Sequence, residues 1–247
     1  KGHMYWLKAM EIPDLPASSR GKSINNLIDF SPGERVSSLV AVNEFSDDRF
    51  VVMLTSNGTV KKTRLSLFRH IRIGGIRAIS LHKKSELIMA RLTDGGRDLI
   101  IGTSSGKAIR FSEKEIRPMG RQAAGVKGIN LSPKDRIIGM VVITQDDQYI
   151  FTASEKGFGK KTEVARYPKR HRGGKGVINL KTNKKIGKAV GIMGVSGEEV
   201  LVITELGKTI RVKTEDFRPI GRATQGVKLI DLGKGDRAVS TAKVCES

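Results

Sequence analysis

The chain contains little of what secreted proteins, membrane proteins and most enzymes depend on. Among its 247 residues there is one cysteine, Cys245, so no disulfide can form within the chain. Aromatic residues make up only 5% of the sequence. No apolar run approaches the roughly 18 residues that a membrane-spanning helix requires, and no signal-peptide pattern is present. We therefore expect a cytoplasmic protein that does not enter a membrane.

Catalytic and metal-binding motifs are also missing. The sequence has no Cys-x-x-Cys, His-Glu-x-x-His, Walker-type phosphate loop or Gly-x-Ser-x-Gly. The stretch from Gly102 to Gly106 looks like a glycine-rich loop, but it lies in a predicted hairpin with no helix after it. The histidines show no ligand spacing; they are His3, His70, His82 and His171. We expect no catalytic residue, no metal site and no cofactor in this chain.

Acidic residues are scarce relative to basic ones. Forty-five Lys and Arg stand against twenty-five Asp and Glu, which gives a formal net charge of +20 and a pI near 10.2. Solubility alone requires far less charge than this. The excess is concentrated between Lys156 and Lys188, where the only acidic residue is Glu163. A charge of this size predicts a polyanionic partner, which could be DNA, RNA or an anionic membrane surface.

What the sequence does contain is a repeat of about fifty residues. Glycines that precede a basic, strand-like segment recur 56, 48, 51 and 50 residues apart, at Gly2, Gly58, Gly106, Gly157 and Gly207. A second basic glycine anchor follows each first one, at Arg20-Gly21-Lys22, Gly75-Ile76-Arg77, Gly125-Val126-Lys127, Gly173-Gly174-Lys175 and Gly226-Val227-Lys228. Such a period is typical of blades around an axis. We predict one domain over residues 1–247, with units at roughly 1–49, 50–97, 98–148, 149–199 and 200–247.

Each unit is predicted to contain four short strands. Apolar β-rich runs alternate with polar turns, and no segment shows sustained helical periodicity. In the third unit the strands are expected at Asp98–Thr103, Lys107–Phe111, Gly128–Leu131 and Arg136–Val142, with one helical turn at Ser112–Ile116. In the fourth unit the third strand is expected at Val177–Leu180. We therefore predict an all-β, propeller-like disc of four-stranded blades.

The first unit is expected to be incomplete. It has candidates for its second, third and fourth strands at Met4–Leu7, Ile24–Ile28 and Val36–Val42, but nothing precedes Gly2 to supply the first. We expect about five blades in this chain, the first of them incomplete, and a parent protein that continues upstream.

Basic glycine loops are the candidate functional site. Glycine lets the backbone approach a partner closely, so its N–H groups can bond phosphate oxygens while nearby Arg and Lys supply charge. The densest loop is Lys169–Gly176. The candidate DNA-binding residues of these loops and adjacent strands are Arg20, Lys22, Lys61, Lys62, Arg72, Arg77, Lys107, Arg110, Arg117, Arg121, Lys127, Lys160, Lys161, Lys169, Arg170, Arg172, Lys175, Arg211, Arg218, Arg222 and Lys228.

The same loops indicate recognition of the nucleic-acid backbone and not of its bases. No recognition helix, zinc finger or stacking aromatic pair is present. A row of basic loops on a rigid disc suits a bent duplex, as in proteins that wrap DNA without base contacts.

Four stretches resemble the C-terminal domain of the DNA gyrase A subunit, and the resemblance extends over all 247 residues. They are Gly157–Thr162, Tyr167–Asn179, Arg117–Arg121 and Gly221–Val227. The resemblance implies a six-bladed β-pinwheel, whose neighbouring blades exchange a strand. It also implies positive wrapping of double-stranded DNA for ATP-dependent negative supercoiling. The active-site tyrosine and ATPase would lie elsewhere in the enzyme, and the partners in the bacterial nucleoid would be the gyrase B subunit together with the rest of the gyrase A subunit.

One departure from that family bears on wrapping. Its hallmark box, Gln-Arg-Arg-Gly-Gly-Lys-Gly, belongs to the first blade, which is expected to be absent here. The related loop of a later blade has Arg170 where the box has Gln. The fragment is therefore expected to bind and bend DNA, while chiral wrapping depends on the missing blade.

Two other interpretations stay open. The equivalent domain of topoisomerase IV belongs to the same class, although its blades are usually fewer or more degenerate. A propeller that binds protein or RNA is the other, but a protein-binding propeller would have apolar or mixed loop tips and near-neutral charge.

Overall fold

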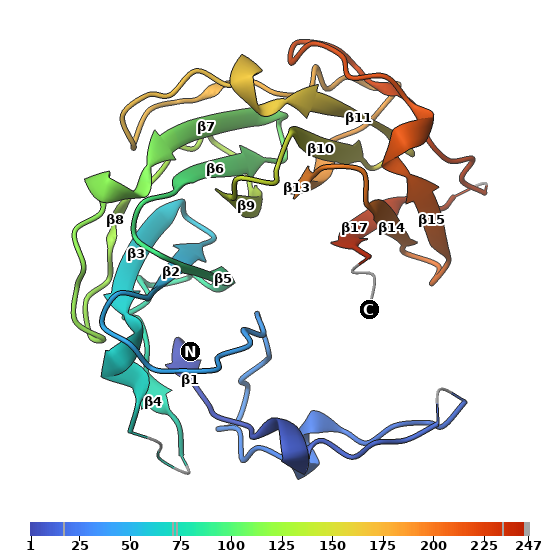
Figure 1. Cartoon of the computed structure of the whole chain (residues 1–247). Helices are drawn as coiled ribbons and strands as arrows, with labels where there is room; N and C mark the ends of the chain where they lie inside the picture. The colour runs from blue at the N-terminus through green and yellow to red at the C-terminus, as the bar shows by residue number, and fades with distance from the viewer. Residues whose placement is uncertain (17, 71, 73, 234, 245–247) are drawn as a thin grey trace.

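The computed structural model describes residues 1–16, 18–70, 72, 74–233 and 235–244, so Cys245 lies outside the described residues. The chain folds into short antiparallel strands and single 3-10 turns, which confirms the all-β prediction. Figure 1 shows the sheets arranged in an arc around a common axis. In the described part of the chain, no helix is long and apolar enough to cross a membrane.

The centre of each complete unit is a tight hairpin. Its strands form where alternating or continuous apolar residues flank a turn that contains glycine, such as Ser56-Asn57-Gly58. Two strands of five or six residues pair across this turn. These hairpins are β2 (Phe50–Thr55) with β3 (Thr59–Arg64), β6 (Asp98–Thr103) with β7 (Lys107–Ser112), β10 (Tyr149–Ser154) with β11 (Phe158–Glu163), and β14 (Glu199–Thr204) with β15 (Thr209–Lys213).

A third strand lines the inner side of each hairpin, toward the axis of the arc (Figure 1). It corresponds to the predicted fourth strand of each unit and pairs with the first strand of the hairpin. These inner strands are β5 (Leu87–Thr93), β9 (Ile137–Ile143), β13 (Ala189–Val195) and β17 (Ala238–Lys243).

The outer edges of the first three hairpins each pair with a short strand from the next unit, whereas the outer edge of the last hairpin has no such partner within the described residues. Val177 and Ile178 of the fourth unit, for example, pair with Ala108 and Lys107 of the third. The predicted third strand Val177–Leu180 is thus shortened to Val177–Ile178, whereas the one predicted at Gly128–Leu131 is wrong, because the strand lies just before it at Val126–Lys127. Both observed strands complete a neighbour's sheet. The strands donated in this way are β4 (Ile76–Arg77) to β1 (His3–Met4), β8 (Val126–Lys127) to β3, β12 (Val177–Ile178) to β7, and β16 (Val227–Lys228) to β11.

Single 3-10 turns connect each hairpin to the loop that follows it, and two more lie in the first unit. The prediction of one helical turn at Ser112–Ile116 is confirmed, because Ser112 caps a turn over Glu113–Glu115 by accepting a bond from the Lys114 amide. The turns are η1 (Ala9–Glu11), η2 (Ile24–Asn26), η3 (Leu65–Phe68), η4 (Glu113–Glu115), η5 (Val164–Arg166) and η6 (Thr214–Asp216).

The strands predicted in the first unit are mostly wrong. Only Met4 of Met4–Leu7 belongs to a strand, Ile24–Asn26 forms a 3-10 turn, and Val36–Val42 has no strand. A strand needs a partner edge, and the described residues of 1–49 hold no counterpart of β2. Val40 and Val42 instead pack as irregular chain against the core of the second unit.

The hydrophobic core lies between neighbouring sheets. One buried cluster joins Val52 and Leu54 of β2 to Leu99 and Ile101 of β6 and to Phe111 of β7. Other clusters of the same kind link the later sheets. Burial of such side chains stabilises by roughly 1.5–3 kcal/mol each, so the contacts between units hold the arc together.

Candidate nucleic-acid interface

The predicted basic loops lie at the outer side of the arc, between each 3-10 turn and the donated strand (Figure 1). The structure divides the 21 predicted residues into three groups by exposure. Exposed are Arg20, Lys22, Arg72, Arg77, Arg117, Lys127, Lys169, Arg170, Lys175, Arg211, Arg218 and Lys228. Half-buried are Lys107, Arg110, Arg121, Arg172 and Arg222. Buried are Lys61, Lys62, Lys160 and Lys161.

Consecutive loops are bonded to each other through their backbones. The Gly173 amide donates to the Gly128 carbonyl at 2.7 Å, and the Asn130 amide donates back to the Gly174 carbonyl at 2.9 Å. The Lys181 amide makes the corresponding bond to the Thr224 carbonyl at 2.8 Å. The loops therefore form one continuous rim, which we define as residues 117–130, 168–181 and 218–228.

Arginine side chains add a second set of bonds along this rim. The Arg172 guanidinium donates to the Lys127 carbonyl at 3.0 Å and to the Glu115 carbonyl at 3.2 Å. The Arg222 guanidinium donates in the same way to the Ile178 carbonyl at 2.9 Å. These side chains fix neighbouring loops as well as supplying charge, a role that the sequence prediction missed. The available signal was an Arg four residues before each of Gly125, Gly176 and Gly226.

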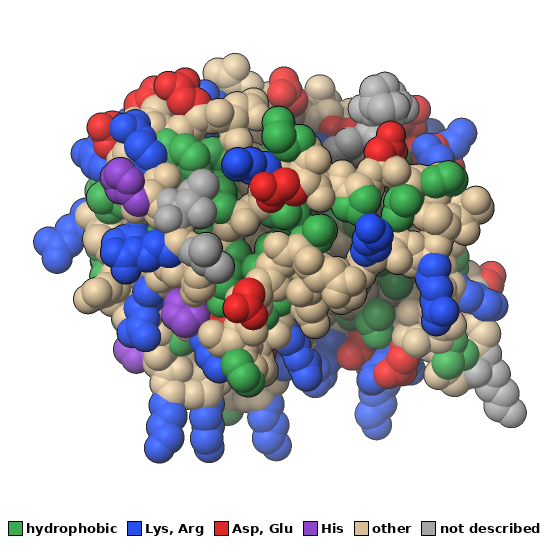
Figure 2. Space-filling view, turned by 90° about the horizontal axis from the view of Figure 1, so that it is seen from below, with side chains coloured by type: hydrophobic (Ala, Val, Ile, Leu, Met, Phe, Trp, Pro, Cys, Tyr) green, Lys and Arg blue, Asp and Glu red, His purple; other side chains and the backbone are tan. Residues whose placement is uncertain are grey.

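The exposed cations differ in whether an acid already neutralises them. Lys169 is paired with Asp98 at 2.7 Å, while Arg211 pairs with Glu199 and Lys228 with Asp231. Arg170 and Lys175 form no ion pair within the described residues. Figure 2 shows Lys and Arg side chains projecting side by side from one edge of the molecule. Cations without a partner acid are available to an external anion.

Two of the buried lysines donate hydrogen bonds to backbone carbonyls of the rim loops. Lys61 Nζ donates to the carbonyls of Ala78 at 2.6 Å and Arg121 at 2.5 Å. Lys160 Nζ donates to the carbonyls of Gly221 at 2.8 Å and Arg222 at 2.5 Å. Burial lowers the pKa of Lys61 to about 8 and that of Lys160 to about 7, with the neighbouring arginine adding to each shift. Their prediction as surface phosphate contacts is wrong, because side chains that are fully buried do not reach an external phosphate.

The adjacent position of the same strands also connects units. Lys62 Nζ donates to the Glu113 carbonyl at 2.8 Å and lies 3.8 Å from the Glu113 carboxylate. Arg110 takes the equivalent place, donating to the Val164 carbonyl at 3.1 Å. Lys161 lies over the ring of Phe217, 5.7 Å from its centroid. The prediction that Lys62 and Lys161 line a phosphate surface is corrected in the same way, because their charges are buried against the next unit.

The anchor glycines serve docking between units. Gly106 has a φ of +80°, and a Cβ there would lie 2.0 Å from the Leu180 carbonyl oxygen of the next unit. Gly176, with a φ of +72°, is placed in the same way against the preceding unit, where a Cβ would lie 2.6 Å from the Ala108 carbonyl oxygen. Gly176 is thus the structural counterpart of Gly125 and Gly226, and the predicted fourth anchor at Gly173-Gly174 is displaced by two to three residues. The Gly173 amide is already bonded, so it is not open to a phosphate.

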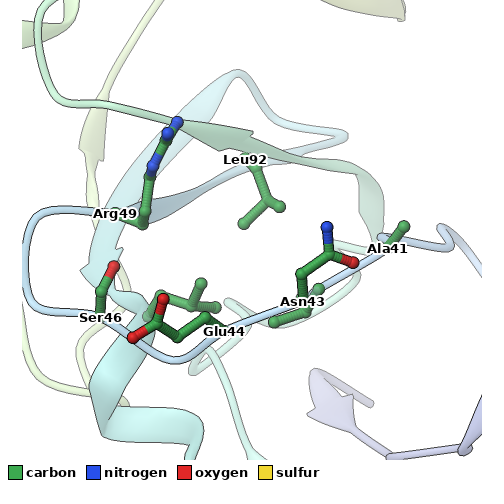
Figure 3. Close-up of a pocket in the computed structure, with 8 residues that line it drawn as sticks. Ala41, Asn43, Glu44, Ser46, Arg49 and Leu92 are labelled. Carbon is green, nitrogen blue, oxygen red and sulfur yellow. The ribbon is translucent and has the colours of Figure 1, made fainter.

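A small polar pocket lies apart from the rim. It has a volume of about 370 Å³ and forms where residues 41–46 pass beside β5 and the start of β2 (Figure 3). Arg49 and Glu44 line it together with Leu65 and Leu92. No sequence pattern indicated this pocket. No cluster of potential metal ligands occurs among the residues that the structure describes.

Known proteins resemble the chain over its whole length. It is 40% identical to the DNA gyrase A subunit of Staphylococcus epidermidis over 249 aligned positions, which cover 100% of this chain and 28% of that protein. It is also 40% identical to the DNA gyrase A subunit of Helicobacter pylori, covering 94% of this chain and 28% of that protein. The chain thus spans less than a third of the length of these relatives.

Solved structures and a family model agree with this likeness. A C-terminal domain of DNA topoisomerase IV superposes with a TM-score of 0.90 at 29% identity, covering 99% of this chain and 76% of the other. A DNA gyrase A C-terminal domain superposes with a TM-score of 0.86 at 24% identity, covering 99% and 80%, which supports the fold. The family model described as "DNA gyrase C-terminal domain, beta-propeller" matches residues 1–43, 49–94, 97–144, 148–196 and 198–245. The chain therefore belongs to the DNA gyrase C-terminal domain family.

Proposed function

We propose that this chain is a non-catalytic DNA-binding module of a type IIA topoisomerase, and that it bends and wraps duplex DNA around its basic rim. The observation that carries the proposal is the continuity of the rim, in which consecutive basic loops are bonded through Gly173 and Gly128 and through Lys181 and Thr224. A rim of this kind offers phosphates one rigid, curved surface. The net charge of +20 supplies the attraction.

The energetics favour such a role. Bending 20–30 bp through a large angle costs roughly 1–6 kcal/mol by elastic estimates. Each phosphate that is neutralised releases counterions, which offsets the bending term and makes binding fall steeply with salt. The rim contains only two-residue strands and no α-helix to place in a groove, so the proposed contacts are to the DNA backbone and not to the bases.

Within the type IIA class, we propose DNA gyrase as the parent enzyme. The two relatives described above are gyrase A subunits that cover 94% or more of this chain, and the family model is that of the gyrase domain. The wrapped segment would be presented for strand passage during ATP-dependent negative supercoiling. The gyrase B subunit, together with the remainder of the gyrase A subunit, would supply the chemistry in the nucleoid, and this module would need no cofactor. Topoisomerase IV is the alternative, supported by the superposition on its C-terminal domain.

Plasmid ligation tests wrapping directly. Nicked circles are closed with increasing amounts of the chain, freed of protein, and resolved as topoisomers. A protein-dependent shift toward positive linking differences is the expected result. Salt-sensitive duplex binding with no shift would restrict the function to binding and bending. If a single-stranded RNA of equal length competes as well as the duplex, the DNA assignment is refuted.

A further inference from the structure

Two kinds of residue alternate at one position of the outer strands. Three residues after the first anchor glycine, successive units carry Lys61, Ile109, Lys160 and Ile210. In the first unit the same position is Tyr5, three residues after Gly2. In the first four units along the chain, this position faces the basic glycine loop of the following unit.

The alternation matches two classes of loop. The lysines bond to loops of the form Arg-Pro-x-Gly-Arg: Lys61 bonds to the loop 117–121, and Lys160 bonds to the loop 218–222. Tyr5 and Ile109 instead contact loops that contain Gly-Gly. A Cβ at Gly174 would lie 3.5 Å from Ile109 Cδ1, and a Cβ at Gly75 would lie 2.7 Å from the Tyr5 ring.

In the Arg-Pro-x-Gly-Arg loops, backbone carbonyls face the strand that carries the lysine and accept hydrogen bonds from its ammonium group. The Arg222 carbonyl accepts from Lys160 Nζ at 2.5 Å, and the Gly221 carbonyl accepts both from Lys160 Nζ and from the Thr224 hydroxyl, each at 2.8 Å. A carbonyl that is shielded from water and lacks a donor costs up to about 1–3 kcal/mol, so the ammonium bond to the Arg222 carbonyl helps to hold this loop in place. Lys61 bonds the equivalent Arg121 carbonyl of the other loop.

We propose that Lys61 and Lys160 are positioning residues, which hold the backbone of Arg121 and Arg222 so that these loops present their cations to DNA. The part of this proposal that concerns DNA binding rests on the proposed function. The lysines act without touching a phosphate, and the apolar residue at Ile109 sets the Gly-Gly loop by packing alone.

Hydrogen exchange on the DNA-free chain tests the positioning. The Ile220 amide donates to the Lys161 carbonyl at 3.0 Å, and the Lys181 amide to the Thr224 carbonyl, so both amides report on the 218–225 loop. K160M keeps the length of the side chain and removes its donors. It should speed exchange at both amides by about tenfold or more, as expected for losing buried bonds to a charged donor. The amides between β10 and β13 should be unchanged, and I109M should leave all of them unchanged.

A double-mutant cycle tests whether the effect reaches DNA through Arg222. K160M and R222Q are measured singly and together for duplex affinity at one salt concentration. If Lys160 acts by positioning Arg222, K160M weakens binding several-fold in the wild-type background and has little effect in R222Q. Additive losses, or unchanged exchange in K160M, would overturn the proposal.

Further controls separate the possible failures. Failure of the wild-type chain to bind duplex would refute the proposed function, while the exchange result would still decide positioning. If K160M does not fold, the wild-type chain is measured as a function of pH. Protection of the Ile220 amide, corrected for intrinsic exchange, should then increase above about pH 7, because opening the loop exposes Lys160, returns its pKa toward the ordinary value and takes up a proton. Constant protection would count against the proposal.

Discussion

At the scale of single residues, Lys160 shows how a lysine on a strand can be buried inside the protein. Its ammonium has two backbone carbonyls as partners, and Arg222 is the charged group whose repulsion adds to the effect of burial. A buried cation of this kind loses its proton more readily than one in water. The ionisation of Lys160 therefore links stability to pH.

We predict that the stability difference between the wild type and K160M rises with pH from about 7 toward 10. The pKa of Lys160 is about 7 in the folded chain, against an ordinary value of 10.5. Between these values the unfolded chain binds more protons, so the free energy of unfolding increases with pH. Urea unfolding at several pH values up to 9 measures the difference. A flat or falling difference would show that Lys160 remains charged.

The identity of the basic residues could be predicted from the sequence, but not the burial of four of them. The pattern around Lys61-Lys62 and Lys160-Lys161 is that of a strand with one apolar face, which places the charges in solvent. In the structure the loop of the next unit covers that side, and backbone carbonyls replace water as acceptors. That loop lies about sixty residues away in sequence, so no local pattern reveals it.

At the scale of elements, hairpins were predictable and donated strands were not. The hairpin at Asn57-Gly58 has a strong local turn signal, and both of its strands are long enough to show a pattern. A donated strand such as Val177–Ile178 is two residues long and pairs with Ala108 and Lys107 in another unit. Its position depends on that partner, so the sequence prediction placed it too broadly and in the wrong sheet.

We predict that Gly106→Ala destabilises the chain far more than Gly207→Ala does. Both glycines have a positive φ, +80° and +83°, so both substitutions bear a similar backbone strain of about 1 kcal/mol. Only at Gly106 would the added methyl also meet a backbone oxygen, that of Leu180 at 2.0 Å, whereas nothing lies within 4 Å at Gly207. Chemical denaturation of the two variants measures the comparison. Equal losses of stability would mean that the docking of Gly106 contributes little.

At the scale of the whole molecule, the exposed cations of the rim set the dependence of DNA binding on salt. Arg170 and Lys175 lie in one loop and form no ion pair in the part of the chain that the structure describes. Arg172, between them, is occupied in part by the carbonyls of Glu115 and Lys127. Overall charge was therefore predictable from composition, while the assignment of each cation to solvent or to the fold required the structure.

We predict that R170Q/K175Q makes the negative slope of log K against log salt shallower by about 1.8, since each phosphate contact contributes about −0.9. Fluorescence anisotropy of a labelled duplex at four or five salt concentrations measures the slope. Lys83, which is exposed in the turn before β5, provides the control, and K83Q should leave the slope unchanged. An unchanged slope in the double variant would remove this loop from the DNA footprint.

The donated strands also impose an order on folding during synthesis. While the chain emerges from the ribosome, the edge at Ala108 stays open until Val177 has been made, and the edge at Gly159 until Val227 has followed. Each of these sheets is thus completed only after the following unit has been synthesised, so the growing chain carries an unpaired strand edge during translation. Such an edge is a template for pairing with a neighbouring nascent chain, so synthesis on crowded polysomes is the stage at which this protein is most exposed to misassembly.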